Sequence, residues 1–237
     1  MATPGATKVD LIAALKQAFG YRHYLELTTP TTGGRYAEVR SLAWDACHRL
    51  VYRNTGVEHA DGLPVDFASP DEDISLPLAE IGRRRLTYDI ALVDAHHTYH
   101  CTARDLRAIY RLVRRGGALV VHDCWPRDAN LASPRFVSGP WCGVTYRAYL
   151  DFVLGNPRLD YCTVDTDYGC GIILKSLSPV RWARNIARAA RQMSLAQQWS
   201  RIGPDHDDAF DFLCTHYRAL LRLVDLELFA RKLRAGM

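Results

Sequence analysis

Two apolar runs, each ending in a polar cluster, restrict the fold more than any other feature of the sequence. The runs are YDIALVDA at residues 88–95 and ALVVHD at residues 118–123. Continuous apolar strands of this kind are typical of parallel sheets that are covered on both faces. Between them, apolar residues recur at helical spacing and predict a helix over residues 100–114, followed by two glycines. The three segments therefore predict a strand–helix–strand unit.

The rest of the chain continues this alternation. Alternating YCTV, a turn and the apolar run GIILK predict a hairpin over residues 159–175. Helices are predicted at 8–20, 35–54, 74–82, 144–154, 180–199 and 206–233, and strands at 23–27, 57–60 and 64–68. The predicted fold class is α/β, with a parallel sheet, helices on both faces, a C-terminal antiparallel hairpin and extra C-terminal helices. We expect a core over residues 1–178 and a helical extension over 179–237 that packs on the core or on a partner subunit.

Composition excludes several classes of protein. The net charge of +4 is mild and the basic residues are scattered, so we expect no nucleic-acid partner. Apolar runs are far shorter than the roughly 20 residues of a membrane span, so we expect no membrane partner. The seven cysteines form no CxxC pair, and MATPGATKVD lacks the pattern of a signal peptide. Both observations favour reduced thiols and a cytoplasmic location.

Polar side chains follow the predicted strands where each strand ends. Glu26 and the 28–34 turn lie at the end of the first strand, Asp94 to Tyr99 at the end of the run at 88–95, and His122 to Trp125 at the end of the run at 118–123. In parallel sheets, ligands bind at the carboxyl ends of the strands. We therefore expect these residues along one edge, as the floor of a cleft.

The order of these motifs resembles the class I S-adenosylmethionine-dependent methyltransferases, which have a Rossmann-like sheet. The resemblance is strongest to the small-molecule, sugar-modifying branch, with its Asp-X-X-His-X-Tyr signature, here Asp94, His97 and Tyr99. The segments RLVRRGGALVVHD, GVTYRAYLDFV and TDYGCG continue the match, which covers about residues 20–175. More narrowly, the chain is similar to aminoglycoside N-methyltransferases of gentamicin-type biosynthesis.

The sequence departs from that family in the loop after the first strand. The family's glycine motif follows its acidic residue directly, whereas Glu26 is followed by LTTPTTGG. We expect Gly33 and Gly34 to let the backbone approach the cofactor, and the threonine hydroxyls, including that of Thr28, to replace part of the missing motif.

The resemblance implies S-adenosyl-L-methionine as the cofactor and suggests which residues hold it. Glu26 would hold the cationic amino group, and Asp94 would lie beneath the reactive centre. Glu58 or Asp61 would bind the ribose hydroxyls. Asp71 or Glu72 would meet the adenine amine, although a cap at a helix start explains them equally well.

Methyl transfer needs an aligned nucleophile and, for many acceptors, a base. His97 is the preferred base, because neutral imidazole dominates near pH 7; Asp94 and Asp123 are the other catalytic candidates. Successive strand residues point in opposite directions, so we expect only one of His122 and Asp123, preferably Asp123, to face the cleft. We expect no metal, although Asp94 and Asp123 leave a Mg²⁺ site open as an alternative. The candidate substrate-binding residues are Tyr99, His122, Trp125, Trp141 and Tyr146.

We therefore predict a methyltransferase that acts on an amino group of a sugar-containing small molecule, as in aminoglycoside antibiotic biosynthesis. The acidic string 204–211, with Asp205, Asp207 and Asp208, would attract a cationic amino sugar; a solvated helix start is the plainer interpretation. The final helices would pair with a second subunit in a homodimer or cover the site. The alternatives are a metal-assisted O-methyltransferase, a nicotinamide-dependent oxidoreductase and a non-catalytic binding protein of the same fold.

Overall fold

The computed structural model describes residues 5–30, 35–53, 62–176, 178–203 and 206–234. These residues form a single eight-stranded sheet with the strand order β3-β2-β1-β4-β5-β7-β6-β8. The strands are β1 (His23–Thr28), β2 (Ala46–Val51), β3 (Phe67–Ala68), β4 (Tyr88–Asp94), β5 (Val113–Val121), β6 (Asp160–Val164), β7 (Cys170–Leu174) and β8 (Leu223–Val224). The predicted α/β fold class is confirmed.

The sheet is parallel from β3 to β5, and β7 is the antiparallel strand within it. β1 is the middle strand of this parallel part, with β2 on one side and β4 on the other. The predicted hairpin is present as the antiparallel pair of β6 and β7. Because β1, β4 and β5 are neighbouring parallel strands, their carboxyl ends meet at one edge of the sheet.

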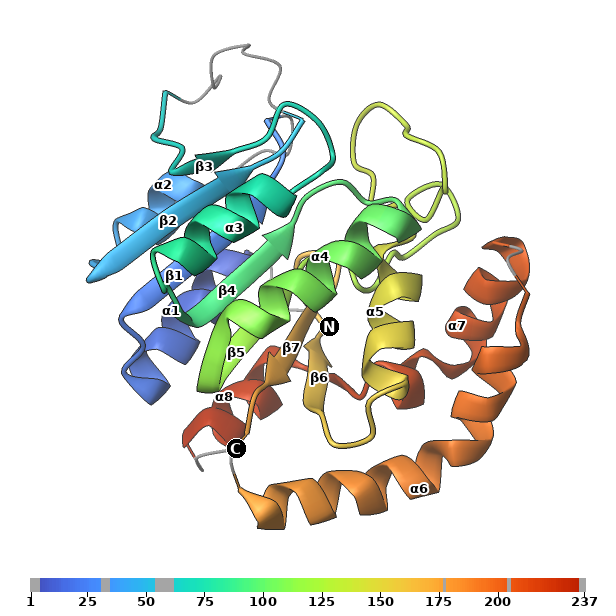
Figure 1. Ribbon diagram of the computed structural model, residues 1–237. Helices are drawn as coiled ribbons and strands as arrows, with labels where there is room; N and C mark the ends of the chain where they lie inside the picture. The colour runs from blue at the N-terminus through green and yellow to red at the C-terminus, as the bar shows by residue number, and fades with distance from the viewer. Residues whose placement is uncertain (1–4, 31–34, 54–61, 177, 204–205, 235–237) are drawn as a thin grey trace.

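Helices cover both faces of this sheet (Figure 1). Helices α1, α2 and α8 pack on one face, and α3 to α7 pack on the other. The helices are α1 (Lys8–Phe19), α2 (Tyr36–Arg40), α3 (Ser75–Arg83), α4 (Tyr99–Leu112), α5 (Thr145–Leu154), α6 (Pro179–Arg201), α7 (His206–Leu220) and α8 (Leu226–Arg234). In the described part of the chain, no helix is both long and apolar enough to span a membrane.

The predicted helix over residues 35–54 is wrong in its second half. Helix α2 ends at Arg40, Ala43 takes a positive φ of 58°, and the chain then enters β2. Leu50 and Val51 are both buried, because β2 is covered on both faces. A strand that is buried on both faces lacks the alternation that would distinguish it from a helix. The strand predicted at 57–60 lies outside the described residues, and the strand predicted at 64–68 is reduced to β3.

Two predicted helix boundaries are also wrong, one at Gly116–Gly117 and one at Arg222. The pair Gly116–Gly117 does not end the helix but lies inside β5. Glycine is needed at position 117 because a Cβ atom there would lie 2.4 Å from the Asp89 carbonyl oxygen. The helix predicted over 206–233 is broken at Arg222, which has a positive φ of 48°. Strand β8 follows that residue and adds to the sheet edge beside β6.

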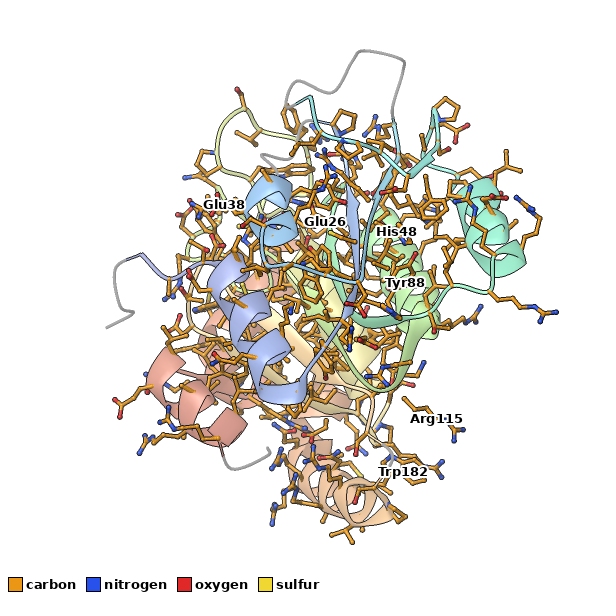
Figure 2. All side chains as sticks on the ribbon, turned by 90° about the vertical axis from the view of Figure 1, so that its left-hand side faces the viewer. Glu26, Glu38, His48, Tyr88, Arg115 and Trp182 are labelled. Atoms are coloured by element: carbon orange, nitrogen blue, oxygen red, sulfur yellow. The ribbon has the colours of Figure 1, made fainter. Side chains whose placement is uncertain are left out.

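The C-terminal segment contacts both faces of the sheet. Helix α8 packs near α1, whereas Trp199 of α6 and Phe210 of α7 join the core on the opposite face. The boundary at residue 178 between the core and the helical extension stays a prediction, as does the homodimer. Figure 2 shows Trp182 on α6 near the bottom of the view, well below Glu26.

Candidate active site

Three polar side chains share one face of the sheet at its carboxyl edge. Asp94 is the last residue of β4 and lies opposite Thr28 of β1. Glu26 lies two positions earlier on β1, and His122 follows the last residue of β5. The three belong to the face that α1 covers, because they continue the alternation of Tyr24, Leu92 and Val120. The predicted meeting of the strand ends is thus present, with Glu26 one step deeper than Asp94.

Asp94 is the centre of a buried ionic cluster. One of its oxygens, Oδ2, forms an ion pair with the Lys8 ammonium group of α1. The other, Oδ1, lies 3.3 Å from His122 Nδ1 and 3.6 Å from His97 Nε2. Asp123 Oδ2 lies 3.2 Å from His122 Nδ1 and 3.3 Å from His97 Nδ1. Asp94 and Asp123 are therefore bridged by two imidazole rings.

Both His122 and Asp123 face this cluster, which corrects the expectation that only one of them would. Asp123 has a positive φ of 60°, so the alternation of the strand ends before it. The turn of the hairpin completes the far side, because Asp167 Oδ2 lies 3.3 Å from His122 Nε2. His122 therefore connects the end of β5 to the β6–β7 turn.

The positive and negative groups of this cluster stabilise one another's charged forms. Burial alone would raise the pKa of Asp94, but the Lys8 ammonium and His122 outweigh burial and hold it well below its usual value. Burial would lower the pKa of His122, yet the Asp123 and Asp94 carboxylates raise it well above the ordinary value. Despite burial, the hydrogen bond and charge of His122 lower the pKa of Asp167 to about 2. His122 is therefore an imidazolium at neutral pH, held among carboxylates.

His97 is held in one orientation by the loop that joins β5 to α5. Its Nδ1 lies 2.6 Å from the Trp141 carbonyl oxygen, which accepts only from a protonated nitrogen, so Nδ1 carries a proton. The Trp141 ring stacks on the imidazole at a centroid distance of 5.4 Å. Nε2 is therefore the nitrogen that titrates. Figure 1 shows this loop beside the start of α4.

The charge of His97 differs from the sequence-based expectation. Burial would lower its pKa, but the hydrogen bond to Asp94 and the charge of Asp123 raise it above the ordinary value. The site thus stabilises the imidazolium form of His97 more than water does, and the neutral form becomes more populated as the pH rises. The His97 side chain is 12% exposed, and its Nε2 atom is buried.

Gly143 allows the loop to approach His97 closely. It has a positive φ of 56°, and a Cβ atom there would lie 2.2 Å from the His97 carbonyl oxygen. The next amide, of Val144, donates to that same carbonyl oxygen at 2.9 Å. Only glycine combines this conformation with this contact.

We expect Gly143→Ala to lower the free energy of unfolding by about 1–3 kcal/mol and to reduce turnover, because the His97 backbone must move. Thermal or urea unfolding and steady-state rates measure the two effects. Gly139→Ala is the matched control: Gly139 also has a positive φ, of 96°, but an added Cβ atom meets nothing within 4 Å. Equal loss of activity in both variants would contradict this role of Gly143.

A small polar cavity lies beside the cluster. Its volume is about 10 Å³, the space of one water-sized group. Its lining includes the His97 and His122 rings, which face the carboxylates of the cluster, and Thr145 Oγ1, a buried atom with no hydrogen-bond partner among the described residues. Buried polar atoms are normally paired. The cavity is therefore suited to one small hydrogen-bonding group from a ligand.

Glu26 lies buried on β1, close to α2 (Figure 2). Burial raises its pKa to about 7, against the lowering effect of a 2.8 Å hydrogen bond from the Tyr24 hydroxyl. A ligand cation would favour the ionised form. Glu26 therefore fits the predicted role of binding a cationic amino group.

The positions of the other predicted cofactor residues do not indicate whether they bind the cofactor. Thr28 is buried at the end of β1, and its hydroxyl lies 3.3 Å from the Thr29 carbonyl oxygen. Asp71 accepts from the Asp73 amide at 2.8 Å and from the Ser69 hydroxyl at 3.2 Å, as expected for a turn before α3. Gly33, Gly34, Glu58 and Asp61 lie outside the described residues. The cofactor roles of all six stay predictions.

Of the predicted substrate-binding residues, Trp141 and His122 reach the cluster and three others have structural neighbours. Tyr99 is half-exposed and donates to Asp151 Oδ2 at 2.7 Å. Trp125 is buried and stacks on Tyr217 of α7 at 4.7 Å. Tyr146 is fully buried among aromatic rings of α6 and α7.

Sequence reasoning missed Lys8 and Asp167. A single lysine at a helix start carries no signal, and Asp167 was visible only within TDYGCG. Sequence reasoning also missed Tyr52. Its hydroxyl accepts a hydrogen bond from the His96 amide at 2.9 Å and donates one to the buried Asp105 carboxylate at 3.0 Å. This pair fixes the turn that precedes His97.

The donor atoms of Asp94, His97 and Asp123 lie within 4.8 Å of one another, as do those of His122, Asp167 and Cys170. The first group brings carboxylates close enough for a divalent cation. However, Asp94 is already paired with the Lys8 ammonium and faces two imidazoles. While Lys8 is in place, this donor set does not fit a divalent cation.

Residues 20–124, from the start of β1 to just beyond β5, match the family model described as a methyltransferase domain. This range contains Glu26, Asp94, His97 and Asp123. This part of the chain is a methyltransferase domain. Comparison of the chain with curated proteins gave no match.

Solved structures resemble this chain distantly. An O-methyltransferase from Bacillus cereus in complex with SAH is 14% identical, with a TM-score of 0.48 over 74% of this chain and 83% of that chain. The O-methyltransferase TomG from Streptomyces achromogenes, involved in tomaymycin synthesis and in complex with SAM, is 16% identical, with a TM-score of 0.49 over 70% and 78%. The methyltransferase MycE of the mycinamycin pathway, in complex with Mg, SAH and mycinamycin VI, is 16% identical, with a TM-score of 0.40 over 65% and 45%.

Proposed function

We propose that the protein methylates a hydroxyl group of a small, sugar-containing molecule, with His97 as the general base. The observation that carries this proposal is the orientation of His97. Its Nδ1 proton is held by the Trp141 carbonyl, so Nε2 faces the polar cavity and Asp94 as the proton acceptor. A hydroxyl nucleophile needs such a base more than an amine does, because an amine has only to be unprotonated.

S-adenosyl-L-methionine is the methyl donor and supplies a methyl group on a positively charged sulfur. His97 Nε2 would accept the proton of the acceptor hydroxyl during the displacement. The Asp94 and Asp123 carboxylates, 3.6 and 3.3 Å from the ring nitrogens, would stabilise the imidazolium that results. The stacked Trp141 ring would exclude water from one face of the imidazole. Holding the reactants in line can supply roughly 7–11 kcal/mol of the barrier reduction.

An amino sugar is the second candidate acceptor. Asp207 and Asp208 are exposed in the first turn of α7, and His206 of that turn lies 3.3 Å from the hydroxyl of Tyr146 in α5. An acidic helix start beside α5 would attract a cationic acceptor. Replacing both aspartates by asparagine would then raise KM for aminated acceptors and leave KM for neutral acceptors unchanged.

Transfer of labelled methyl groups to an acceptor panel tests the proposal. The panel contains neutral glycosides, phenols and aminoglycosides, and the methylated atom is located by NMR spectroscopy. We expect an O-methyl product whose formation requires His97. An N-methyl product would support the second candidate, whereas binding of the donor without transfer to any panel member would count against both acceptor classes.

Glu26 is expected to control cofactor affinity in a pH-dependent way. Its carboxyl is neutral below its raised pKa of about 7, so it pairs with a cationic amino group only above that pH. Affinity for S-adenosylhomocysteine should therefore increase as the pH rises through 7. Glu26→Gln should weaken binding about 10- to 100-fold at pH 7.5 and much less at pH 6. Calorimetry at the two pH values measures this, and a pH-independent loss would contradict the role.

A further inference from the structure

We propose that the Lys8 ammonium group takes the place at Asp94 that a divalent cation would occupy, so that the site works without a metal ion. The proposal deepens the methyltransferase function above and rests on it for the role of Asp94. It concerns Lys8 of α1, which lies outside the matched methyltransferase domain.

The first observation is the placement of Lys8. Its side chain is 9% exposed, and its Nζ forms an ion pair with Asp94 Oδ2, 86 positions away in the sequence. A buried lysine is rare unless it is paired. Long, flexible lysines on a surface commonly change partners, but this one has entered the interior of the catalytic cluster.

The second observation is that the hairpin turn holds the start of α1 in position. The Lys8 backbone amide donates to Asp167 Oδ2 at 2.8 Å, and the Thr166 hydroxyl donates to the Ala6 carbonyl oxygen at 2.5 Å. The same Asp167 carboxylate faces His122. The motif TDYGCG therefore fixes both the backbone that carries Lys8 and the histidine on the other side of Asp94.

The third observation is the set of donors around Asp94. Two carboxylates close together are a common basis for divalent-cation sites. Here Oδ2 of Asp94 is engaged by an ammonium, and Oδ1 and Asp123 both face the imidazoles of His97 and His122. A divalent cation at Asp94 would lie beside the Lys8 ammonium and be repelled by it. Lys8 instead neutralises Asp94 and holds its carboxylate against His97 Nε2, which makes Lys8 a positioning residue.

Binding of Mn²⁺, measured by electron paramagnetic resonance on the metal-free protein, tests the proposal without any acceptor molecule. We expect weak, non-stoichiometric binding to the wild type. Lys8→Met keeps a long side chain but removes the charge, and should bind one Mn²⁺ at least about tenfold more tightly. Lys8→Arg should behave like the wild type. Lys16→Met should do so too, because it removes another lysine of α1, whose ammonium group lies over the Trp44 ring. In Lys8→Met/Asp94→Asn the gained site should disappear.

Tight stoichiometric Mn²⁺ binding to the wild type that Asp94→Asn abolishes would overturn the proposal, and so would unchanged weak binding to a folded Lys8→Met variant. Circular dichroism verifies folding, and Lys8→Gln replaces Lys8→Met if that variant does not fold. Where an acceptor is known, wild-type turnover should also persist in excess chelator. Because the Mn²⁺ measurement needs no turnover, failure of the proposed function and failure of the Lys8 proposal give separate results.

Discussion

Replacing His97 with alanine should lower kcat for methyl transfer by about 10²- to 10⁴-fold, the usual contribution of a general base. Affinity for S-adenosylhomocysteine should change by less than about threefold, because the base acts on the acceptor and not on the cofactor. The reason lies in the geometry: Nδ1 is held by the Trp141 carbonyl, and Nε2 faces Asp94 and the small cavity. Single-turnover rates with a labelled donor measure the effect directly.

His96→Ala is the matched control for this variant. The His96 ring contacts Arg53 and the edge of Trp141, and its pKa is lowered mainly by burial and by Arg53. His96→Ala should lower kcat by less than about fivefold. A comparable loss in both variants would indicate that the loop around residues 96–97 is disturbed and that His97 is not the base.

The pH dependence of the wild type gives a second readout for His97. Its pKa is raised above 6.5, and a base acts only when deprotonated, so kcat/KM should rise with pH and reach half its maximum above pH 6.5. This acidic limb should be absent from the residual activity of His97→Ala. A profile that is flat from pH 6 to 8 would contradict the assignment of His97 as the base.

Replacing Asp94 with asparagine should lower the free energy of unfolding by about 3–5 kcal/mol, because it leaves buried cations without their partner. Lys8 and His122 both depend on this carboxylate, and Lys8 is 9% exposed. Urea unfolding at pH 7 measures the loss. Asp45→Asn, which removes an exposed ion pair with Arg22, is the control and should change stability little.

A double variant separates the charge effect from general damage. Lys8→Met in the Asp94→Asn background removes the orphaned ammonium, so the double variant should be more stable than the sum of the single losses predicts. Strict additivity would indicate that Lys8 and Asp94 do not interact in solution. Asp167 adds a pH signature in the wild type. Its pKa is lowered to about 2, so its contribution is complete above about pH 4 and is lost as the pH falls towards 2.

The parallel sheet and the meeting of its strand ends could be predicted because short segments of the sequence encode them. The apolar runs at β4 and β5 identify strands covered on both faces, and each stops at a polar residue that must reach a cleft. Asp94 and His97 could be predicted for the same reason, since Asp94 ends β4 and His97 lies in the turn that follows it. β2 was missed for the converse reason: a strand buried on both faces can present apolar residues at helical spacing.

The remaining parts of the site are held together by contacts that no local pattern encodes. Lys8 and Asp94 are separated by 86 positions, and His122 and Asp167 meet only because the hairpin folds back beside β5. Asp123 faces the cluster because its backbone leaves the strand conformation, which a rule of alternation cannot anticipate. Aromatic residues such as Trp125 and Tyr146 are equally suited to a sugar pocket and to a core, and here they pack against α6 and α7.

A crystal structure with S-adenosylhomocysteine bound would test most directly whether β1, β4 and β5 form one methyl-transfer site. We expect the ligand's amino group to lie within hydrogen-bond distance of the Glu26 carboxylate, about 3 Å. We also expect the sulfur to face the side of the cluster that carries His97 and Asp94. A ligand bound away from these strand ends, or with its sulfur turned from His97, would contradict the account.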